Sequence, residues 1–272
     1  MKEFETSTRA VLDALNVDLV TVGEFGCCGH PLKSVDYRAA IAASARNIAL
    51  AESRGLTLLT LCSCCYGNLV NARGILSASV KMRDKVNQAL AREKLEYQGN
   101  GKVRHVFEAL ALDIGLERLN ARLVRRFHGL KVAPQYGCHL LRPVQTAPSG
   151  QAADPALFDR LLEVLGAESV AWPTGRECCG APALGVQDDV SLKMRERKVG
   201  SAAEAGIDII GAACPFCYLQ LNGGNGRRKD ADRPYAALFT KMLGLCLGIS
   251  PKKLGVSPET KPEDAKMLAA LR

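Results

Sequence analysis

The hydrophobic positions of the chain follow one order of elements twice. In the second half, apolar runs at 131–137 and 207–213 predict buried strands, and ESVAWP at 168–173 predicts another. Segments at 157–166 and 187–206 predict the helices between them, the first because its apolar residues recur at helical spacing. Strands that alternate with helices indicate an α/β fold.

The first half has the same order. It predicts a helix at 4–17, a strand at 18–25, a helix at 36–54, a strand at 56–61 and a helix at 66–91. Asp36 is the expected N-cap of the middle helix. The continuous apolar strands are typical of parallel sheets that are buried on both faces. We therefore expect two pseudo-symmetric, Rossmann-like α/β domains with parallel sheets.

The repeat also predicts the domain boundaries. We expect an N-terminal domain at 1–115, a C-terminal domain at 116–250 and a polar tail at 251–272 that docks a partner or is mobile. When the halves are aligned through Leu15 and Leu165, the counterparts of the strand at 131–137 and of Cys138 fall before Met1. The N-terminal domain is therefore expected to lack an opening strand and its first cysteine.

Composition narrows the class of protein. The 272 residues are 47% hydrophobic and 24% charged, as in a globular protein, and include no apolar stretch of membrane-spanning length. The N-terminus has no features of a signal peptide, so we expect a cytoplasmic protein. In that compartment disulfides are rare, and the 11 cysteines indicate metal or redox chemistry.

The net charge of +8 does not change this interpretation. The basic residues are scattered and only 5% of the residues are aromatic, so nucleic-acid binding is not expected. A surface for an acidic partner or an anionic substrate fits the charge better, and a solvated basic face fits it best.

The cysteines of each half come directly after predicted strands. Because the carboxyl ends of parallel strands share one edge of the sheet, we expect each set to converge there. One set is Cys27, Cys28, Cys62 and Cys65, and the other is Cys138, Cys178, Cys179, Cys214 and Cys217. Two copies of CCG followed by CxxC are hard to explain as core packing.

Thiolate ligands favour soft metal centres, namely zinc, copper(I) or an iron–sulfur cluster. Adjacent cysteines suit neighbouring irons of a cluster better than one tetrahedral ion. Cys64 aligns with Phe216 in the repeat and is either a supplementary ligand or a bystander, whereas Cys246 lies in an apolar run and is expected in the core.

The segments around these cysteines resemble a known family. GCCGHP at 26–31, LCSCCYG at 61–67, YGCHLLRP at 136–143 and AALFTKMLGLCLGI at 236–249 are similar to segments of the cysteine-rich subunit of heterodisulfide reductases, which contains a CCG domain twice. The resemblance covers essentially the whole chain except the missing opening.

The resemblance implies the cofactors. In the family, five cysteines of a complete domain hold a noncubane [4Fe-4S] cluster, and two clusters face a cleft between the domains where a disulfide is split. The complete set here is Cys138, Cys178, Cys179, Cys214 and Cys217. The incomplete set is Cys27, Cys28, Cys62 and Cys65, with Cys64 as a possible addition, and either a second [4Fe-4S]-type cluster or zinc is expected there.

Two histidines are candidate catalytic residues. His139 follows Cys138 and His30 follows the Cys27–Gly29 turn, where each can supply a proton or positive charge to a released thiolate, or merely orient its loop. Arg142 can pair with a substrate carboxylate or phosphate, although a surface role fits it equally well.

The resemblance therefore indicates the iron–sulfur catalytic subunit of a heterodisulfide-reductase-like complex, acting on a disulfide or a lipoate-type sulfur carrier. The Ala-rich composition, with 21 Arg against 15 Lys, favours a bacterial source and sulfur metabolism. Without a GxGxxG or P-loop motif, flavin or cubane clusters are expected in partner subunits.

Two alternatives stay open. One is an electron-transfer subunit of another CCG-containing oxidoreductase, of the lactate or glycolate oxidase or succinate–quinone type. The other is an assembly subunit with a structural metal.

Overall fold

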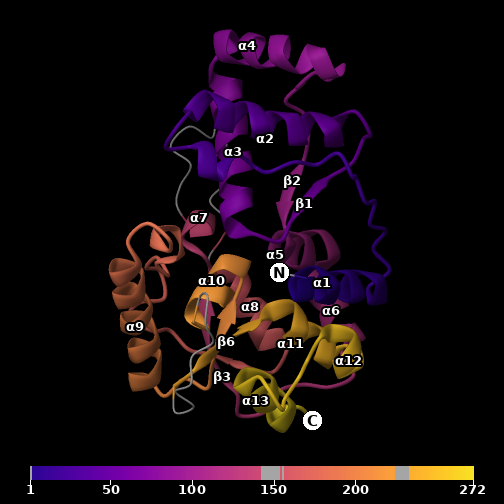
Figure 1. Ribbon diagram of the computed structural model, residues 1–272. Helices are drawn as coiled ribbons and strands as arrows, with labels where there is room; N and C mark the ends of the chain where they lie inside the picture. The colour runs from indigo at the N-terminus through magenta and orange to yellow at the C-terminus, as the bar shows by residue number, and fades with distance from the viewer. Residues whose placement is uncertain (1, 142–153, 155, 224–232) are drawn as a thin grey trace. The chain divides into compact units, whose positions relative to one another are not determined.

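The computed structural model describes residues 2–141, 154, 156–223 and 233–272. Two compact units, each with parallel strands and packed helices, make up this part of the chain (Figure 1). The first unit comprises Met1–Leu19, Leu110–Cys138 and Pro155–Arg272, and the second comprises Val20–Ala109 and His139–Asp154. The predicted α/β class with parallel sheets is confirmed. The boundaries of two contiguous repeat domains stay a prediction.

The first unit is built on a four-stranded parallel sheet in the order β4-β3-β5-β6. The strands are β3 (Lys131–Gln135), β4 (Glu168–Ser169), β5 (Ile209–Ala212) and β6 (Tyr235–Leu238). All residues of β5 and β6 are buried, which explains their continuous apolar sequence. Cys138 and Cys214 come after β3 and β5, which are neighbours, so both follow the same edge of the sheet.

Helices surround this sheet. They are α1 (Lys2–Ala14), the π-helical η3 (Ala109–Gly115), α6 (Leu116–Arg122), α8 (Ala156–Val164), η4 (Ala181–Ala183), α9 (Asp188–Glu204), α10 (Pro215–Leu221), α11 (Phe239–Cys246), α12 (Pro251–Leu254) and α13 (Pro262–Ala270). The short helix α7 (Cys138–Leu141) begins at Cys138, where the chain leaves this unit. The tail beyond residue 250 is folded in this unit, where α13 packs on β6.

Strand β4 is shorter than the predicted strand at 168–173. The Val170 amide donates to the Val132 carbonyl at 2.9 Å, so Val132 faces β4, and Pro134, two residues on, faces the same side. Proline has no amide proton to extend the ladder. The Trp172 indole instead donates to the Pro134 carbonyl at 3.2 Å. The strand therefore ends where its partner can no longer donate a hydrogen bond.

The second unit has a two-stranded parallel sheet. Its elements are η1 (His30–Leu32), α2 (Tyr37–Glu52), β1 (Leu58–Thr60), α3 (Ser63–Ala78), α4 (Val80–Leu90), η2 (Ala91–Glu93), β2 (Val103–His105) and α5 (Val106–Glu108). Asp36 is the N-cap of α2 as predicted, and its carboxylate accepts from the amides of Arg38 and Ala39 at 3.0 Å. Such a cap stabilises a helix by about 0.5–2 kcal/mol.

Two sequence predictions in the N-terminal half of the chain are wrong. Residues 18–25 form no strand and are largely exposed. Their counterpart β4 pairs only with β3, and the repeat places the counterpart of β3 before Met1, so residues 18–25 have no described strand to pair with. The helix predicted at 66–91 is broken at Ser79, whose backbone is extended and whose hydroxyl accepts from the Met82 amide at 3.2 Å.

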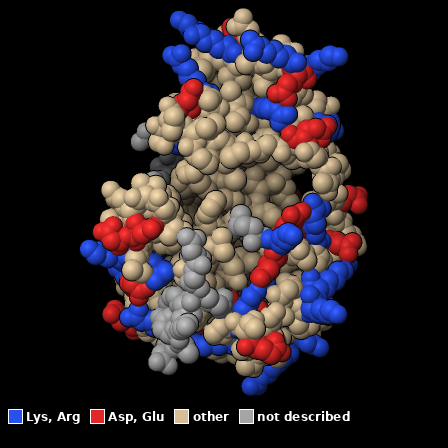
Figure 2. All heavy atoms as spheres, viewed as in Figure 1, with Lys and Arg blue, Asp and Glu red and all other residues tan. Residues whose placement is uncertain are grey.

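Charge and hydropathy agree with the composition. No helix within the described ranges is long and apolar enough to cross a membrane. Lys and Arg side chains gather over α4 (Figure 2), where the chain reads VKMRDKVNQAL.

A buried lysine joins α1 to the end of the chain in the first unit. Lys241 in α11 is 1% exposed, and its ammonium contacts the Glu3 carboxylate at 2.9 Å, the Gly255 carbonyl at 2.8 Å and the Asp264 carboxylate at 3.5 Å. Asp264 is itself fully buried. In Figure 1, α1 lies beside α11 and α12, as these contacts require.

Replacing Lys241 with methionine leaves the Asp264 carboxylate buried without its counter-ion. We expect Lys241→Met to lower the free energy of unfolding by about 3–5 kcal/mol, measured by urea denaturation. Lys253→Met is the matched control, because Lys253 faces Asp13 at 3.8 Å with both side chains exposed, and we expect a change within about 0.5 kcal/mol. Equal losses in the two variants would contradict the buried network.

Candidate metal centres

The paired cysteines of each half lie on a tight glycine turn. Gly29 and Gly180 have φ angles of 82° and 87°, and their amides donate to the thiols of Cys27 and Cys178 at 3.4 Å. A Cβ on Gly29 would lie 2.6 Å from the Ala40 carbonyl oxygen, and one on Gly180 would lie 2.9 Å from that of Ser191. Only glycine therefore allows each turn to pack against the helix that follows it.

Four thiols of the first unit converge. The Cys179 thiol shares hydrogen bonds with Cys178 and Cys217, and Cys217 also bonds to Cys214. Cys214 caps α10, and Cys217 lies one turn further along that helix. The fifth predicted ligand, Cys138, lies at the start of α7, just beyond β3. The structure thus brings Cys178, Cys179, Cys214 and Cys217 together.

The electrostatics of this set suit a soft cation. The hydrogen bond from Cys178 and burial raise the pKa of Cys179 to about 12, although Cys217 opposes the shift. Hydrogen bonds from Cys179 and Cys214, together with burial, also raise the pKa of Cys217. Buried thiols so close together cannot all ionise without positive charge among them. An iron–sulfur cluster or a zinc ion supplies that charge, so the donor set fits either group.

In the second unit, the Cys28 thiol lies beside Cys65. A hydrogen bond with Cys65 lowers the pKa of Cys28 against the opposing effect of burial, and Cys27 and Cys64 are close enough to influence it. The Cys28 carbonyl accepts from the hydroxyl of Ser44 at 2.7 Å and from the amide of Asn68. Cys62 is buried and caps α3. This half therefore also brings predicted ligands together, and Cys64 lies near them.

One buried side chain in each half anchors the segment before the cysteine pair. In α2, the Asn47 amide donates to the Gly26 carbonyl at 3.1 Å and accepts from the Gly26 amide at 2.9 Å. In α9, the Lys198 ammonium donates to the carbonyls of Thr174 and, at 3.1 Å, of Glu177. It also lies 4.5 Å from the centre of the Trp172 ring.

Burial lowers the pKa of Lys198 to about 8, while Cys217, Cys179, the Glu177 carboxylate and Cys178 favour the charged form. Lys198 and Asn47 had no part in the sequence predictions. Their signal was the 151-residue spacing of the repeat, which places both at the same position relative to the CCG turn.

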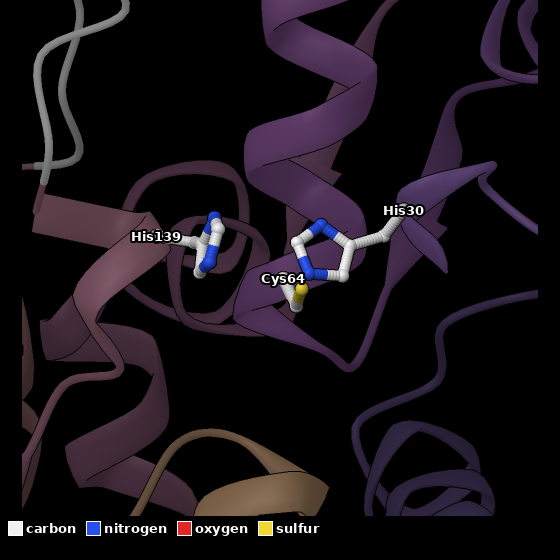
Figure 3. Close-up of side chains that lie close together, drawn as sticks. All are labelled: His30, Cys64 and His139. Carbon is white, nitrogen blue, oxygen red and sulfur yellow. The ribbon is translucent and has the colours of Figure 1, made fainter. Parts of the chain in front are cut away.

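The two candidate histidines lie together in the second unit, beside an unexpected cysteine. The rings of His30 and His139 are 5.0 Å apart, nearly perpendicular, and turned toward each other next to the Cys64 thiol (Figure 3). One donor atom from each of the three residues lies within 4.8 Å of the others, a donor set that zinc also accepts. Gly67 allows this approach, because a Cβ there would lie 2.8 Å from the His139 carbonyl oxygen.

Two further predictions concern single residues. Cys246 is fully buried in α11, where burial raises its pKa to about 12, as suits a core thiol. Arg142 lies outside the described residues.

The fold and the paired thiol sets define a duplicated cysteine-rich α/β protein. The cysteine-rich domain family (CCG) matches the chain twice, at residues 1–70 and 132–222. The sequence is 37% identical over 261 residues to a subunit of the ferredoxin/F(420)H(2)-dependent CoB-CoM heterodisulfide reductase of Methanosarcina acetivorans, covering 93% of this chain and 86% of the relative. The chain belongs to this family of cysteine-rich heterodisulfide reductase subunits, as the resemblance predicted.

Other relatives widen the comparison. A protein of Archaeoglobus profundus that is described as like the same heterodisulfide reductase subunit is 33% identical over 93% of this chain and 88% of its own length. The 8-methylmenaquinol:fumarate reductase membrane anchor subunit of Wolinella succinogenes is 31% identical over 94% and 90%. A hypothetical protein from Helicobacter pylori, 16% identical, has the same fold with a TM-score of 0.73 over 93% of this chain and 48% of its own.

A side chain at Gly180 should disturb the second cysteine pair. We expect Gly180→Ala to destabilise the protein by about 2 kcal/mol, because alanine is strained at positive φ and its Cβ meets the α9 backbone. Gly200→Ala is the control within the same helix, where a Cβ meets nothing within 4 Å, and it should be neutral or up to about 1 kcal/mol stabilising. Thermal unfolding measures both changes. A destabilised Gly200→Ala beside an unaffected Gly180→Ala would contradict the packing described.

Proposed function

We propose that this chain is the iron–sulfur catalytic subunit of a heterodisulfide-reductase-like complex, which cleaves or forms a disulfide or sulfur-carrier bond. The observation that carries the proposal is the convergence of Cys178, Cys179, Cys214 and Cys217 in a chain of this family. The ligands of a noncubane [4Fe-4S] cluster are these four and Cys138. A second [4Fe-4S]-type cluster is held by Cys27, Cys28, Cys62 and Cys65, with Cys64 near them.

The stoichiometry of the reaction supports two centres. Splitting a disulfide into two thiols consumes two electrons and two protons, and iron–sulfur clusters supply electrons one at a time together with Lewis-acidic iron. The electrons come from partner subunits that carry flavin or cubane clusters, because this chain has neither a GxGxxG nor a P-loop motif.

The protons come from this chain in our proposal. His30 and His139 are catalytic, donating a hydrogen bond and then a proton to each sulfur that becomes a thiolate. Their convergence beside Cys64 supports a shared role, because two donors at one place can serve the two sulfurs of one bond.

The substrate is a disulfide or a dithiol of the lipoate type. The setting is the cytoplasm of a bacterium, in sulfur metabolism, on the composition arguments given for the sequence. In such a pathway the same residues accept protons when the reaction runs toward disulfide formation.

A second function is favoured by one observation, the similarity to the fumarate reductase subunit of Wolinella succinogenes. In that case the chain passes electrons to another subunit and turns over no sulfur compound. Reduction of a small disulfide by the chain with an artificial one-electron donor separates the two functions, since only the first predicts thiol release.

Substitution of a proposed ligand tests the metal assignment. Anaerobically purified Cys178→Ser should lose the iron and sulfide of the C-terminal centre and its EPR signal, because a serine hydroxyl is a poor ligand for this soft cluster. Cys246→Ala, which removes a core thiol far along the chain from either set, should keep both centres. About one zinc per chain and no iron, or an unchanged spectrum in Cys178→Ser, would refute the assignment.

Substitution of the histidines tests proton donation. His30→Asn and His139→Asn should each lower kcat for disulfide reduction by about 10²–10⁴-fold while the iron content stays constant. His128→Asn is the control, because His128 is exposed and lies away from the cysteine sets in sequence, and its kcat should stay within twofold. A full kcat in both test variants would leave the two histidines with only an orienting role.

A further inference from the structure

The two halves share a frame, and this frame makes their differences interpretable. A spacing of 151 residues relates Cys27 to Cys178 and Gly29 to Gly180. The same spacing relates Ala40 to Ser191, whose carbonyls lie against the two glycines. Positions compared through this spacing therefore occupy equivalent places beside each cysteine pair.

Asn47 and Lys198 are one such pair of positions. Both are buried, both lie on the helix that follows the CCG turn, and both bind the main chain just before it. Asn47 binds Gly26, and Lys198 binds Glu177, which are themselves 151 residues apart. The anchor is thus the same in the two halves, but one is a neutral amide and the other an ammonium.

The ammonium lies among the groups of the C-terminal set. Its neighbours are the carbonyls of Thr174 and Glu177, the Trp172 ring, the Glu177 carboxylate and the thiols of Cys178, Cys179 and Cys217. Because Lys198 is fully buried, water screens its charge weakly. The neutral anchor in the other half supplies no such charge.

The adjacent basic position differs from this pair. Arg46 and Arg197, also 151 residues apart, are both paired with carboxylates near the surface, Glu93 at 2.7 Å and Glu177 at 2.8 Å. Arg197 is 69% exposed, so solvent screens it. This arginine is common to both halves and cannot distinguish them.

We propose that Lys198 is a positioning residue that raises the reduction potential of the C-terminal centre above that of the N-terminal one, so that an electron from a partner subunit occupies the C-terminal centre first. Reduction adds a negative charge to a thiolate-bound cluster, and a fixed buried cation stabilises the reduced form. Gln135 acts in the same direction, since its amide donates to the Cys217 thiol at 3.7 Å. The inference rests on the proposed function, because it requires iron–sulfur clusters in both sets.

The test is an EPR-monitored redox titration of the full chain. Cys28→Ser retains only the C-terminal centre and Cys178→Ser only the N-terminal one, so the two variants report the two midpoint potentials separately. The C-terminal midpoint should be the higher, and an equal or lower value would overturn the proposal without any change at Lys198.

The second arm changes the charge. In the Cys28→Ser background, Lys198→Met should lower the reduction equilibrium constant of the remaining centre at least tenfold, which is about 59 mV for a one-electron couple. Lys198→Arg keeps the charge and should restore most of the shift. Arg197→Gln removes the same formal charge from the exposed neighbour and should change the constant less than twofold.

The outcomes separate the two levels of the argument. Full iron with an unchanged midpoint in Lys198→Met, or an equal shift in Arg197→Gln, overturns the role of Lys198 and leaves the proposed function intact. Zinc in place of iron in the unmodified chain overturns the proposed function, and the inference with it. If Lys198→Met does not assemble its centre, the comparison of the two single-centre variants decides the question.

Discussion

The packing of each glycine turn against the helix that follows it is the constraint on which both cysteine sets depend. Without a side chain at Gly29 or Gly180, the turn can adopt positive φ and approach the helix backbone to within a distance that any Cβ would block. The adjacent cysteines are then held at the start of the segment that leads into that helix. Their thiols face those of the CxxC segment, although dozens of residues separate the two in the sequence.

Holding several thiols in this way creates an electrostatic problem that a metal centre resolves. Hydrogen bonds and burial raise the pKa of Cys179 and Cys217, so the set retains protons at neutral pH when no cation lies among the sulfurs. A soft metal centre replaces these protons, and its binding is therefore linked to pH as well as to the order of the turns. The glycine turn and the metal support each other, because the turn fixes the donors and the metal removes the cost of burying them.

Much of this arrangement could be predicted from the sequence, because it follows from local chemistry. The cap at Asp36, the strands at 131–137 and 207–213 and the convergence of cysteines at strand ends depend on residues close in the chain or on the general geometry of parallel sheets. The errors have nonlocal causes. Residues 18–25 have a strand pattern but no described partner strand, and β4 is cut short by Pro134 on its neighbour. Similarly, Cys64 has no cysteine counterpart in the repeat, and only folding places it beside two histidines from other segments.

The residue that composition hid most completely is Lys198. In a chain with 36 basic residues, one more lysine in the middle of a long helix carries no visible signal, and only the comparison of equivalent positions in the two halves separates it from its exposed neighbours. A duplication preserves the features that both copies need, here the glycine, the cysteines and an anchor for the turn. Where a shared anchor changes from an amide to an ammonium, the mechanical role is kept and the field around the sulfurs changes. The two copies are therefore equivalent as scaffolds for thiols and inequivalent as electrostatic environments, which is the condition that a pair of one-electron centres needs in order to fill in a fixed order.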